Sequence, residues 1–279
     1  MPTLHETFVP AKRPWRITVL ISGSGSNLQA LMDAASTPRL PSAEITFVLS
    51  SRSNAYGLTR ASTHVPPIPT SVCALKTFLN KHPGSSREDY DAEVARRVLD
   101  SRPDLVILAG WMHILSDAFL DILNGVTPPP RPPALPPPEP ASLPTQTEPI
   151  PSEASSSPEE AAKILDLPSP PKGEVPLHQQ FPIPIINLHP ALPGAFDGAN
   201  AIGRAYDAFN NGEITKTGVM VHRVVREVDR GQPLVVREIE IEKGWTLQQL
   251  ETRIHEVEHE IIVEGAKVVL EQLEKEGRV

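Results

Sequence analysis

Two polar residues at the end of a short apolar segment are the best placed for chemistry. The segment reads PIINLHP, and its Asn187 and His189 are separated by one residue. Side chains at positions i and i+2 of a strand point to the same face, so both groups can reach one substrate atom. An amide N–H can hold a developing oxyanion while an imidazole moves a proton. The spacing therefore predicts acyl-transfer chemistry.

A carboxylate further along the chain is the expected partner of this imidazole. Asp229 opens a turn in the sequence VVREVDRG. We expect its carboxylate to face His189, to favour the imidazolium form and to orient a water molecule. A plain turn-forming aspartate is the other interpretation of this residue.

A glycine-rich loop and an apolar loop supply two further candidate subsites. The loop Ser22–Asn27 reads SGSGSN, and its glycines and the following helix N-terminus suit a phosphate. Because Leu28 stands where a dinucleotide loop needs a third glycine, a single phosphate is favoured over NAD, and a simple tight turn stays open. The second loop, LAGWMHIL at 108–115, offers a wall for a flat heterocycle, although simple core packing fits it equally well.

Composition narrows the class of protein. A formal net charge of −8 without a basic run argues against general nucleic-acid binding. The single cysteine, Cys73, excludes an internal disulfide and a cysteine-based zinc site, and we interpret it as a packed small hydrophobe. Since no apolar run approaches the roughly 20 residues of a membrane span, we expect a cytoplasmic protein that handles small molecules.

The pattern of apolar segments predicts a doubly wound α/β sheet. Apolar, non-alternating strands separated by helices indicate a mostly parallel sheet, and a turn at 229–232 makes the last two strands antiparallel. Such a sheet binds ligands beyond the carboxyl ends of its strands. The expected strands are 17–21, 45–49, 65–69, 105–109, 183–188, 217–224 and 234–241, and the expected helices are 27–35, 56–62, 87–101, 199–210 and 247–275.

Proline marks a long insertion in this pattern. The chain has 32 prolines, and 19 of them fall from Pro128 to Pro184, where they oppose helix and interior strand. We therefore expect one domain over 15–279, interrupted by a disordered insertion at 127–181 and preceded by a flexible N-terminus at 1–14. A brief helical turn near 159–165 and a PxxP ligand role toward SH3-type or WW-type domains are further interpretations of the insertion.

With these features stated, the chain resembles the phosphoribosylglycinamide formyltransferases of purine biosynthesis. The resemblance covers nearly everything outside the insertion and the first 15 residues. The segments that carry it, in family order, are ITVLISGSGSNLQALMDA, SREDYDAEV, PDLVILAGWMHILS, IINLHPALPGAFDGANAI, GVMVHRVVREVDRGQPLV and RIHEVEHEII. It implies a Rossmann-like formyltransferase fold and transfer of a formyl group from 10-formyltetrahydrofolate to the amine of 5'-phosphoribosylglycinamide.

The resemblance also implies a role for each candidate residue. It makes His189, Asn187 and Asp229 catalytic, with Asp229 raising the pKa of His189. The substrate's phosphate and ribose would be bound by Gly25, Ser26, Asn27, His255 and Glu258. The folate would be bound by Arg87, Met112, His113, Ile114, Leu115, Asn187, Val225, Arg226, Glu227, Val228 and Asp229.

The expected mechanism is direct transfer without a covalent intermediate. Asn187 and a protonated His189 stabilise the oxyanion, and Asp229 collects the amine proton through a water. We expect no metal and interpret His255 and His259 as an exposed polar helix face. Two alternatives stay open: a folate-dependent formyltransferase for another amine, such as an amino-sugar nucleotide, and a non-catalytic scaffold that uses its proline-rich segment.

Overall fold

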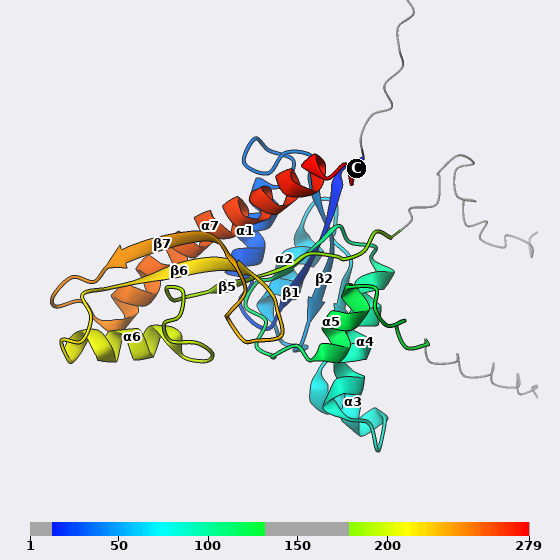
Figure 1. The fold of residues 1–279 in the computed structure, drawn as a ribbon, viewed down its shortest axis with the longest axis horizontal. Helices are drawn as coiled ribbons and strands as arrows, with labels where there is room; N and C mark the ends of the chain where they lie inside the picture. Colours follow the sequence, from blue (N-terminus) through cyan, green and yellow to red (C-terminus); the bar gives the residue numbers. More distant parts are fainter. Residues whose placement is uncertain (1–12, 132–178, 279) are drawn as a thin grey trace, which may run out of the picture. The chain divides into compact units, whose positions relative to one another are not determined.

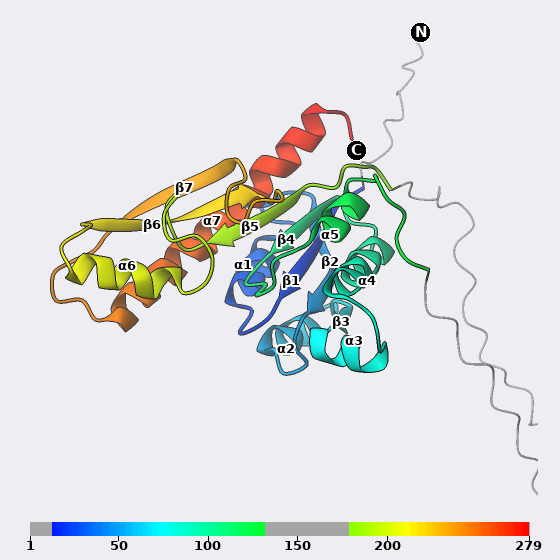
Figure 2. The same ribbon diagram turned by 60° about the horizontal axis from the view of Figure 1, so that its bottom comes forward.

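The protein is described by a computed structural model that covers residues 13–131 and 179–278. Within these residues, one sheet of seven strands has the order β3-β2-β1-β4-β5-β6-β7 (Figure 2). The strands are β1 (Trp15–Ile21), β2 (Ala43–Ser50), β3 (Thr70–Val72), β4 (Leu105–Leu108), β5 (Ile185–His189), β6 (Lys216–Arg223) and β7 (Pro233–Glu240). Neighbours from β3 to β5 pair in parallel, whereas β6 is antiparallel to both β5 and β7. The predicted fold class is confirmed.

Helices cover both faces of this sheet, as an apolar parallel sheet requires. The helices are α1 (Ser26–Ala34), α2 (Tyr56–Thr63), α3 (Leu75–Lys81), α4 (Arg87–Asp100), α5 (Asp117–Leu123), α6 (Ala201–Asn210) and α7 (Leu247–Lys275). One buried cluster joins α1 and α7 to the sheet, and a second joins α4 and α5 to its opposite face (Figures 1 and 2).

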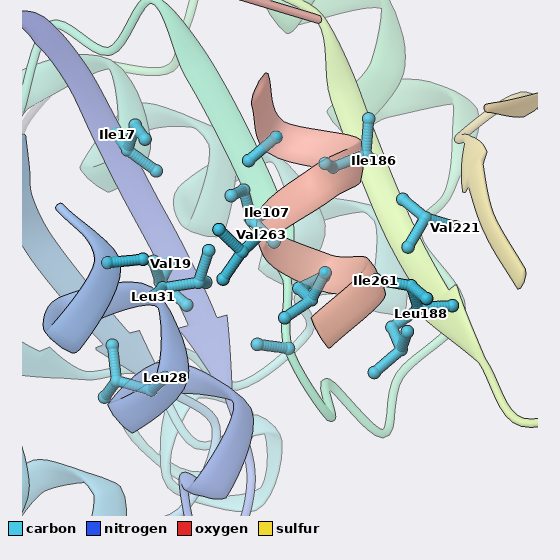
Figure 3. Close-up of a cluster of buried hydrophobic side chains, with 14 of the residues drawn as sticks. Ile17, Val19, Leu28, Leu31, Ile107, Ile186, Leu188, Val221, Ile261 and Val263 are labelled. Carbon is cyan, nitrogen blue, oxygen red and sulfur yellow. The ribbon is translucent and has the colours of Figure 1, made fainter. Parts of the chain in front are cut away.

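Alternation along the strands separates the two clusters. In β1, Val19 packs toward α1 and α7, whereas Leu20 packs toward α4 and α5. Figure 3 shows the first cluster, in which strand residues such as Ile107 meet Leu31 of α1 and Val263 of α7. A core on each face fixes the strand register, so the strand ends that carry the polar residues are held in place.

Local signals explain where the two longest helices begin. Ser86 caps α4 in a capping box with Asp89, and Thr246 caps α7 in a capping box with Gln249. In each box the hydroxyl oxygen accepts a backbone N–H and the second side chain accepts the N–H of the cap, so two otherwise unpaired donors are satisfied. The helix predicted at 247–275 has these bounds in the structure.

Three local expectations about secondary structure were wrong or incomplete. The strand expected at 65–69 is instead β3 at 70–72, because prolines at 66, 67 and 69 have no N–H for a ladder. The helices α3 and α5 were not expected, since both are only seven residues long, and α3 buries no side chain that would give it a periodic signal.

Only the edges of the expected N-terminal segment and of the expected insertion lie within the described residues. Arg13 belongs to the segment expected to be a flexible N-terminus, yet its guanidinium donates to both oxygens of Asp104, at 2.6 and 2.8 Å. Residues 1–12, most of the insertion predicted at 127–181, and the helical turn predicted at 159–165 lie outside the described residues.

Candidate active site

The amide and imidazole of β5 lie beside a third polar side chain. Asn187 is paired with His222 across the antiparallel ladder between β5 and β6. The Nδ2 atom of Asn187 lies 3.2 Å from the Nε2 atom of His222. His189 is only 4% exposed, and its Nε2 atom is buried without a hydrogen-bond partner. An unpartnered imidazole nitrogen of this kind is available to a substrate.

Asp229 connects these three side chains. Its Oδ2 atom lies 3.4 Å from Nδ1 of His189, and its Oδ1 atom lies 3.4 Å from Nε2 of His222. Asn187 donates from Nδ2 to the same Oδ1 atom over 3.3 Å. The expectation that the carboxylate of Asp229 faces His189 is confirmed.

The segment that carries Asp229 reaches the site from an unexpected direction. Because β6 is antiparallel, its last residue, Arg223, pairs with Ile186 and not with the carboxyl end of β5. The carboxyl end of β6 therefore lies away from the carboxyl end of β5. Residues 224–229 bring the carboxylate back to His189, and Asp229 itself has a φ of 55°. The backbone N–H of Gly198 donates to Oδ2 over 2.9 Å and fixes the turn.

Burial and charge act in opposite directions on the imidazole. Burial lowers the pKa of His189, the Asp229 carboxylate raises it and His222 lowers it, and the net pKa lies below the usual 6.5. Asp229 does raise the pKa of His189, as expected, but burial outweighs it, so the imidazolium expected from the sequence is not favoured in the free protein. Burial raises the pKa of Asp229, but hydrogen bonds from His222 and from the Gly198 N–H bring it below its usual 3.8. At neutral pH the pair is a carboxylate beside a neutral imidazole.

His222 is a site residue that was not among the predicted ones. Its Nδ1 atom lies 2.9 Å from the carbonyl oxygen of Arg223, and this contact orients the ring. Its Nε2 atom is thereby directed at Asp229 and Asn187. The sequence did carry one sign of a site residue here, a histidine directly after three apolar strand residues, Val219–Val221. Its partners, however, depend on the pairing of β5 and β6.

The glycine-rich loop has the backbone of an anion-binding turn. Gly25 is the N-cap of α1 in the left-handed region, with φ of 71°, and as a glycine it has no side chain to cap the helix. The first N–H groups of α1, from Ser26 on, therefore stay open to a ligand. A Cβ atom on Gly25 would lie 2.5 Å from the Cα atom of Gly57, so only glycine fits at this N-cap.

Three polar side chains lie next to this loop. Buried Glu258 of α7 accepts a hydrogen bond from Asn27 Nδ2 at 3.2 Å and lies 2.9 Å from Nδ1 of His255. The hydrogen bond to Glu258 raises the pKa of His255 above 6.5. The Oδ1 atom of Asn27 is buried without a partner, so it can accept a hydrogen bond from a ligand hydroxyl.

The loop after β4 forms an apolar wall. Met112 and Ile114 are 64% and 65% exposed although they are large and apolar, whereas Leu115 is buried. The ring of His113 lies 5.9 Å from Tyr90 and 5.5 Å from Trp111, and burial followed by the charge of Arg87 lowers its pKa.

The loop 225–229 lines the same cavity as this wall, and its Val225 and Val228 are also partly exposed. Its Arg226 pairs with Asp117 and with Asp121 of α5. Exposed apolar side chains at a cavity mouth are unusual in a monomer and suit a flat ligand.

One cavity of about 590 Å³ joins these subsites. Every predicted site residue except Arg87 lines it, and so does His222. Arg87 lies behind the wall, where its Nη2 atom donates to the carbonyl oxygen of Ile114 over 2.5 Å. A single cavity thus presents an anion-binding loop, an acyl-transfer cluster and an apolar wall.

The two histidines of α7 line different cavities. Glu256 directly follows His255, so the sequence HEVEH does match the spacing of a zinc-protease motif. In the structure, His255 lines the cavity described above, whereas His259 lines a separate cavity. Among the described residues, no group of three or more His, Cys, Asp or Glu side chains is arranged to hold a metal ion. Within residues 13–131 and 179–278, no helix has the length and apolar character needed to cross a bilayer.

Comparisons with known proteins agree with this geometry. The family model described as "Formyl transferase" matches residues 15–127 and 174–266. Phosphoribosylglycinamide formyltransferase of Schizosaccharomyces pombe is 38% identical to this chain, and the match covers 91% of this chain and 96% of that protein. The Saccharomyces cerevisiae protein of the same name is 38% identical over 93% and 99%. A crystal structure of glycinamide ribonucleotide transformylase 1 from Symbiobacterium toebii has a TM-score of 0.63, 27% identity and coverage of 93% and 89%. The chain belongs to the formyl transferase family, among the phosphoribosylglycinamide formyltransferases.

Proposed function

We propose that this protein transfers a formyl group from 10-formyltetrahydrofolate to the amine of 5'-phosphoribosylglycinamide, giving formylglycinamide ribonucleotide. The observation that carries the proposal is the single cavity that joins the loop at Gly25, the cluster around His189 and the apolar wall. The relatives named phosphoribosylglycinamide formyltransferase support this function over an amino-sugar formyltransferase or a non-catalytic scaffold.

Each substrate has a region of the cavity whose chemistry suits it. The open N–H groups at Ser26 and the charge of His255 suit a phosphate, and Asn27 and Glu258 suit ribose hydroxyls. The exposed side chains of Met112 and Ile114 fit the flat pterin ring of a folate. When bound, the folate supplies a formyl carbon that the amine attacks, while one proton passes from the amine to the folate nitrogen that leaves.

The protein's own groups act on this proton and on the formyl oxygen. In place of the imidazolium expected from the sequence, His189 begins neutral, with its unpartnered Nε2 atom ready to accept the amine proton. Asp229 faces Nδ1 and stabilises the imidazolium that forms. One N–H of Asn187 can leave its long contact and stabilise the negative charge on the formyl oxygen.

The test is the formyl transfer itself, followed by absorbance with both substrates and the purified chain. We expect turnover by the wild-type protein and a loss on the order of 100- to 10,000-fold in His189→Ala. Calorimetric binding of 5'-phosphoribosylglycinamide should change little in that variant, because the loop at Gly25 is separate from the imidazole. A panel of other amines, including amino-sugar nucleotides, tests the substrate. A wild-type protein inactive on the glycinamide nucleotide would disprove the proposal.

A further inference from the structure

The apolar wall has no regular secondary structure to hold it. Residues 109–116 connect β4 to α5 as loop, yet they present Met112 and Ile114 to the cavity. Side chains from other parts of the chain hold the backbone of this loop at three points. Met112 N–H donates to Ser22 Oγ over 3.0 Å, Ile114 C=O accepts from Arg87, and Ser116 N–H donates to Asp91 Oδ2 over 3.1 Å.

Two of these three anchors depend on one buried carboxylate. Asp91 of α4 is 0% exposed and lies one helical turn after Arg87. Its two oxygens accept from Arg87 Nε at 3.1 and 3.2 Å. Asp91 therefore holds Ser116 directly and holds Ile114 through the guanidinium. A buried carboxylate costs free energy unless it is fully paired. A different geometry of the loop that took these partners away from Asp91 would therefore be less stable.

We propose that Asp91 is a positioning residue for the folate subsite, acting through Arg87 and the backbone of residues 114–116. This inference rests on the function proposed above. Neither Asp91 nor Arg87 lines the cavity, so their effect on a ligand passes through the wall. The ring contact of Tyr90 with His113 ties the same helix to the wall at a further point.

The chain offers a matched control on the same helix. Glu93 is 7% exposed and accepts charged hydrogen bonds from Arg96 and Arg97, at 2.7 to 2.8 Å. Its partners do not touch residues 109–116. Like Asp91, Glu93 is a buried carboxylate paired with arginine. Replacing Glu93 by Gln therefore removes a buried charge from α4 but leaves the hydrogen bonds to residues 109–116 in place.

The experiment compares Asp91→Asn, Arg87→Ala, the double variant and Glu93→Gln. Tetrahydrofolate binding is measured by quenching of tryptophan fluorescence, with Trp111 in the cavity wall, and formyl transfer gives KM for each substrate. We expect Asp91→Asn to weaken tetrahydrofolate binding, and to raise KM for 10-formyltetrahydrofolate, on the order of 10- to 100-fold, because charged hydrogen bonds are lost. The KM for 5'-phosphoribosylglycinamide should stay within about 2-fold, because interactions at distant sites are independent.

Arg87→Ala removes an exposed side chain, so it keeps the test valid if Asp91→Asn does not fold. It should weaken tetrahydrofolate binding in the same direction, and the double variant should lose less than the sum of the two, since both act on Ile114. Backbone amides of residues 112–116 should exchange hydrogen faster in both variants, and Glu93→Gln should behave as wild type.

Three results would overturn the inference. One is unchanged tetrahydrofolate binding in folded Asp91→Asn, the second is an equal loss for both substrates, and the third is an equal effect of Glu93→Gln. A wild-type protein that neither binds tetrahydrofolate nor transfers the formyl group would instead disprove the proposed function.

Discussion

The Nδ1 atom of His189 lies 3.4 Å from the Oδ2 atom of Asp229, and each side chain is more than nine-tenths buried. Burial has the largest effect on the pKa of His189 and lowers it, so the net pKa lies below 6.5 despite the carboxylate. The free protein therefore keeps a neutral base beside a fixed negative charge. Because the imidazole starts neutral, it can accept a proton from the substrate. The neighbouring carboxylate then stabilises the imidazolium that forms.

The pH dependence of turnover should follow from this pKa. Activity needs neutral His189, so kcat/KM should fall as the pH drops through a midpoint below 6.5. In Asp229→Asn the carboxylate that raises this pKa is lost, so the imidazole should titrate at a still lower pH while turnover falls. NMR titration of the His189 ring protons measures both pKa values. A higher pKa in Asp229→Asn than in wild type would contradict this account.

Removing His222 should loosen the same carboxylate. His222 Nε2 lies 3.4 Å from Asp229 Oδ1, so His222→Ala removes one of the groups that orient the carboxylate toward His189. We expect a fall in kcat of about 10-fold or more, the size of a lost charged hydrogen bond, with KM values changed less. His64→Ala is the control, because that imidazole contacts the Pro66 carbonyl oxygen and does not line the cavity. Steady-state kinetics that show equal effects of the two variants would refute the role of His222.

The two glycines of the phosphate loop should respond differently to alanine. Gly25 has a φ of 71° and would place a Cβ atom 2.5 Å from the Cα of Gly57, whereas a Cβ on Gly23 meets nothing within 4 Å. Gly25→Ala should lower the free energy of unfolding by about 2 kcal/mol or more, from left-handed strain and backbone overlap. It should also raise KM for 5'-phosphoribosylglycinamide. Urea unfolding of both variants checks this, and a loss as large in Gly23→Ala would show that the conformation of Gly25 is not the cause.

The pair of His255 and Glu258 should make stability and nucleotide binding depend on pH above 6.5. Because the hydrogen bond with Glu258 raises the folded pKa of His255 above 6.5, its contribution is fully present below 6.5 and is lost as the pH rises through the folded pKa. The effect on stability should be small, below about 1 kcal/mol, since the imidazole is half exposed.

The clearer result should be a rise in KM for 5'-phosphoribosylglycinamide over the same pH range, as positive charge near the phosphate loop disappears. Glu258→Gln should lower the pKa of His255, which NMR titration measures. An unchanged pKa in that variant would rule out the hydrogen bond as its cause.

Local patterns in the sequence were sufficient for most of the fold and for most of the residues that line the cavity. Apolar runs located β1 and β4, and the long pattern of apolar and polar residues after them located α7. Asn187 and His189 could be paired because a strand places alternate side chains on one face. The phosphate loop was recognisable because its glycines precede a helix.

Relations between distant segments could not be read from the sequence in the same way. The role of His222 depends on its register with Asn187, and the pKa of His189 depends on how deeply the assembled site buries it. The carboxylate of Asp91 appears as an ordinary charge of an amphipathic helix until α4 packs against the loop at Ser116. Burial and register are products of tertiary packing, so patterns within one segment do not determine them.

The segments that flank the proline-rich insertion contact each other at residues 123–125 and 181–183. Gly125 packs against Phe181 so closely that a Cβ atom on Gly125 would lie 2.9 Å from the Phe181 side chain. Next to this contact, Ile183 N–H donates to Leu123 C=O over 2.9 Å. We therefore expect that residues 132–178 can be replaced by a flexible Gly/Ser linker that is long enough to join residues 131 and 179.

This deletion should leave kcat/KM within about 2-fold of the full chain, because the residues that line the cavity are all retained. The free energy of unfolding should rise by at most about 2 kcal/mol, since a shorter loop costs less entropy to close. Formyl transfer and urea unfolding of the two chains test this side by side. A deletion variant that folds with the same cooperativity but loses activity would mean that residues 132–178 complete the site, and would contradict the proposal that the insertion is separable from catalysis.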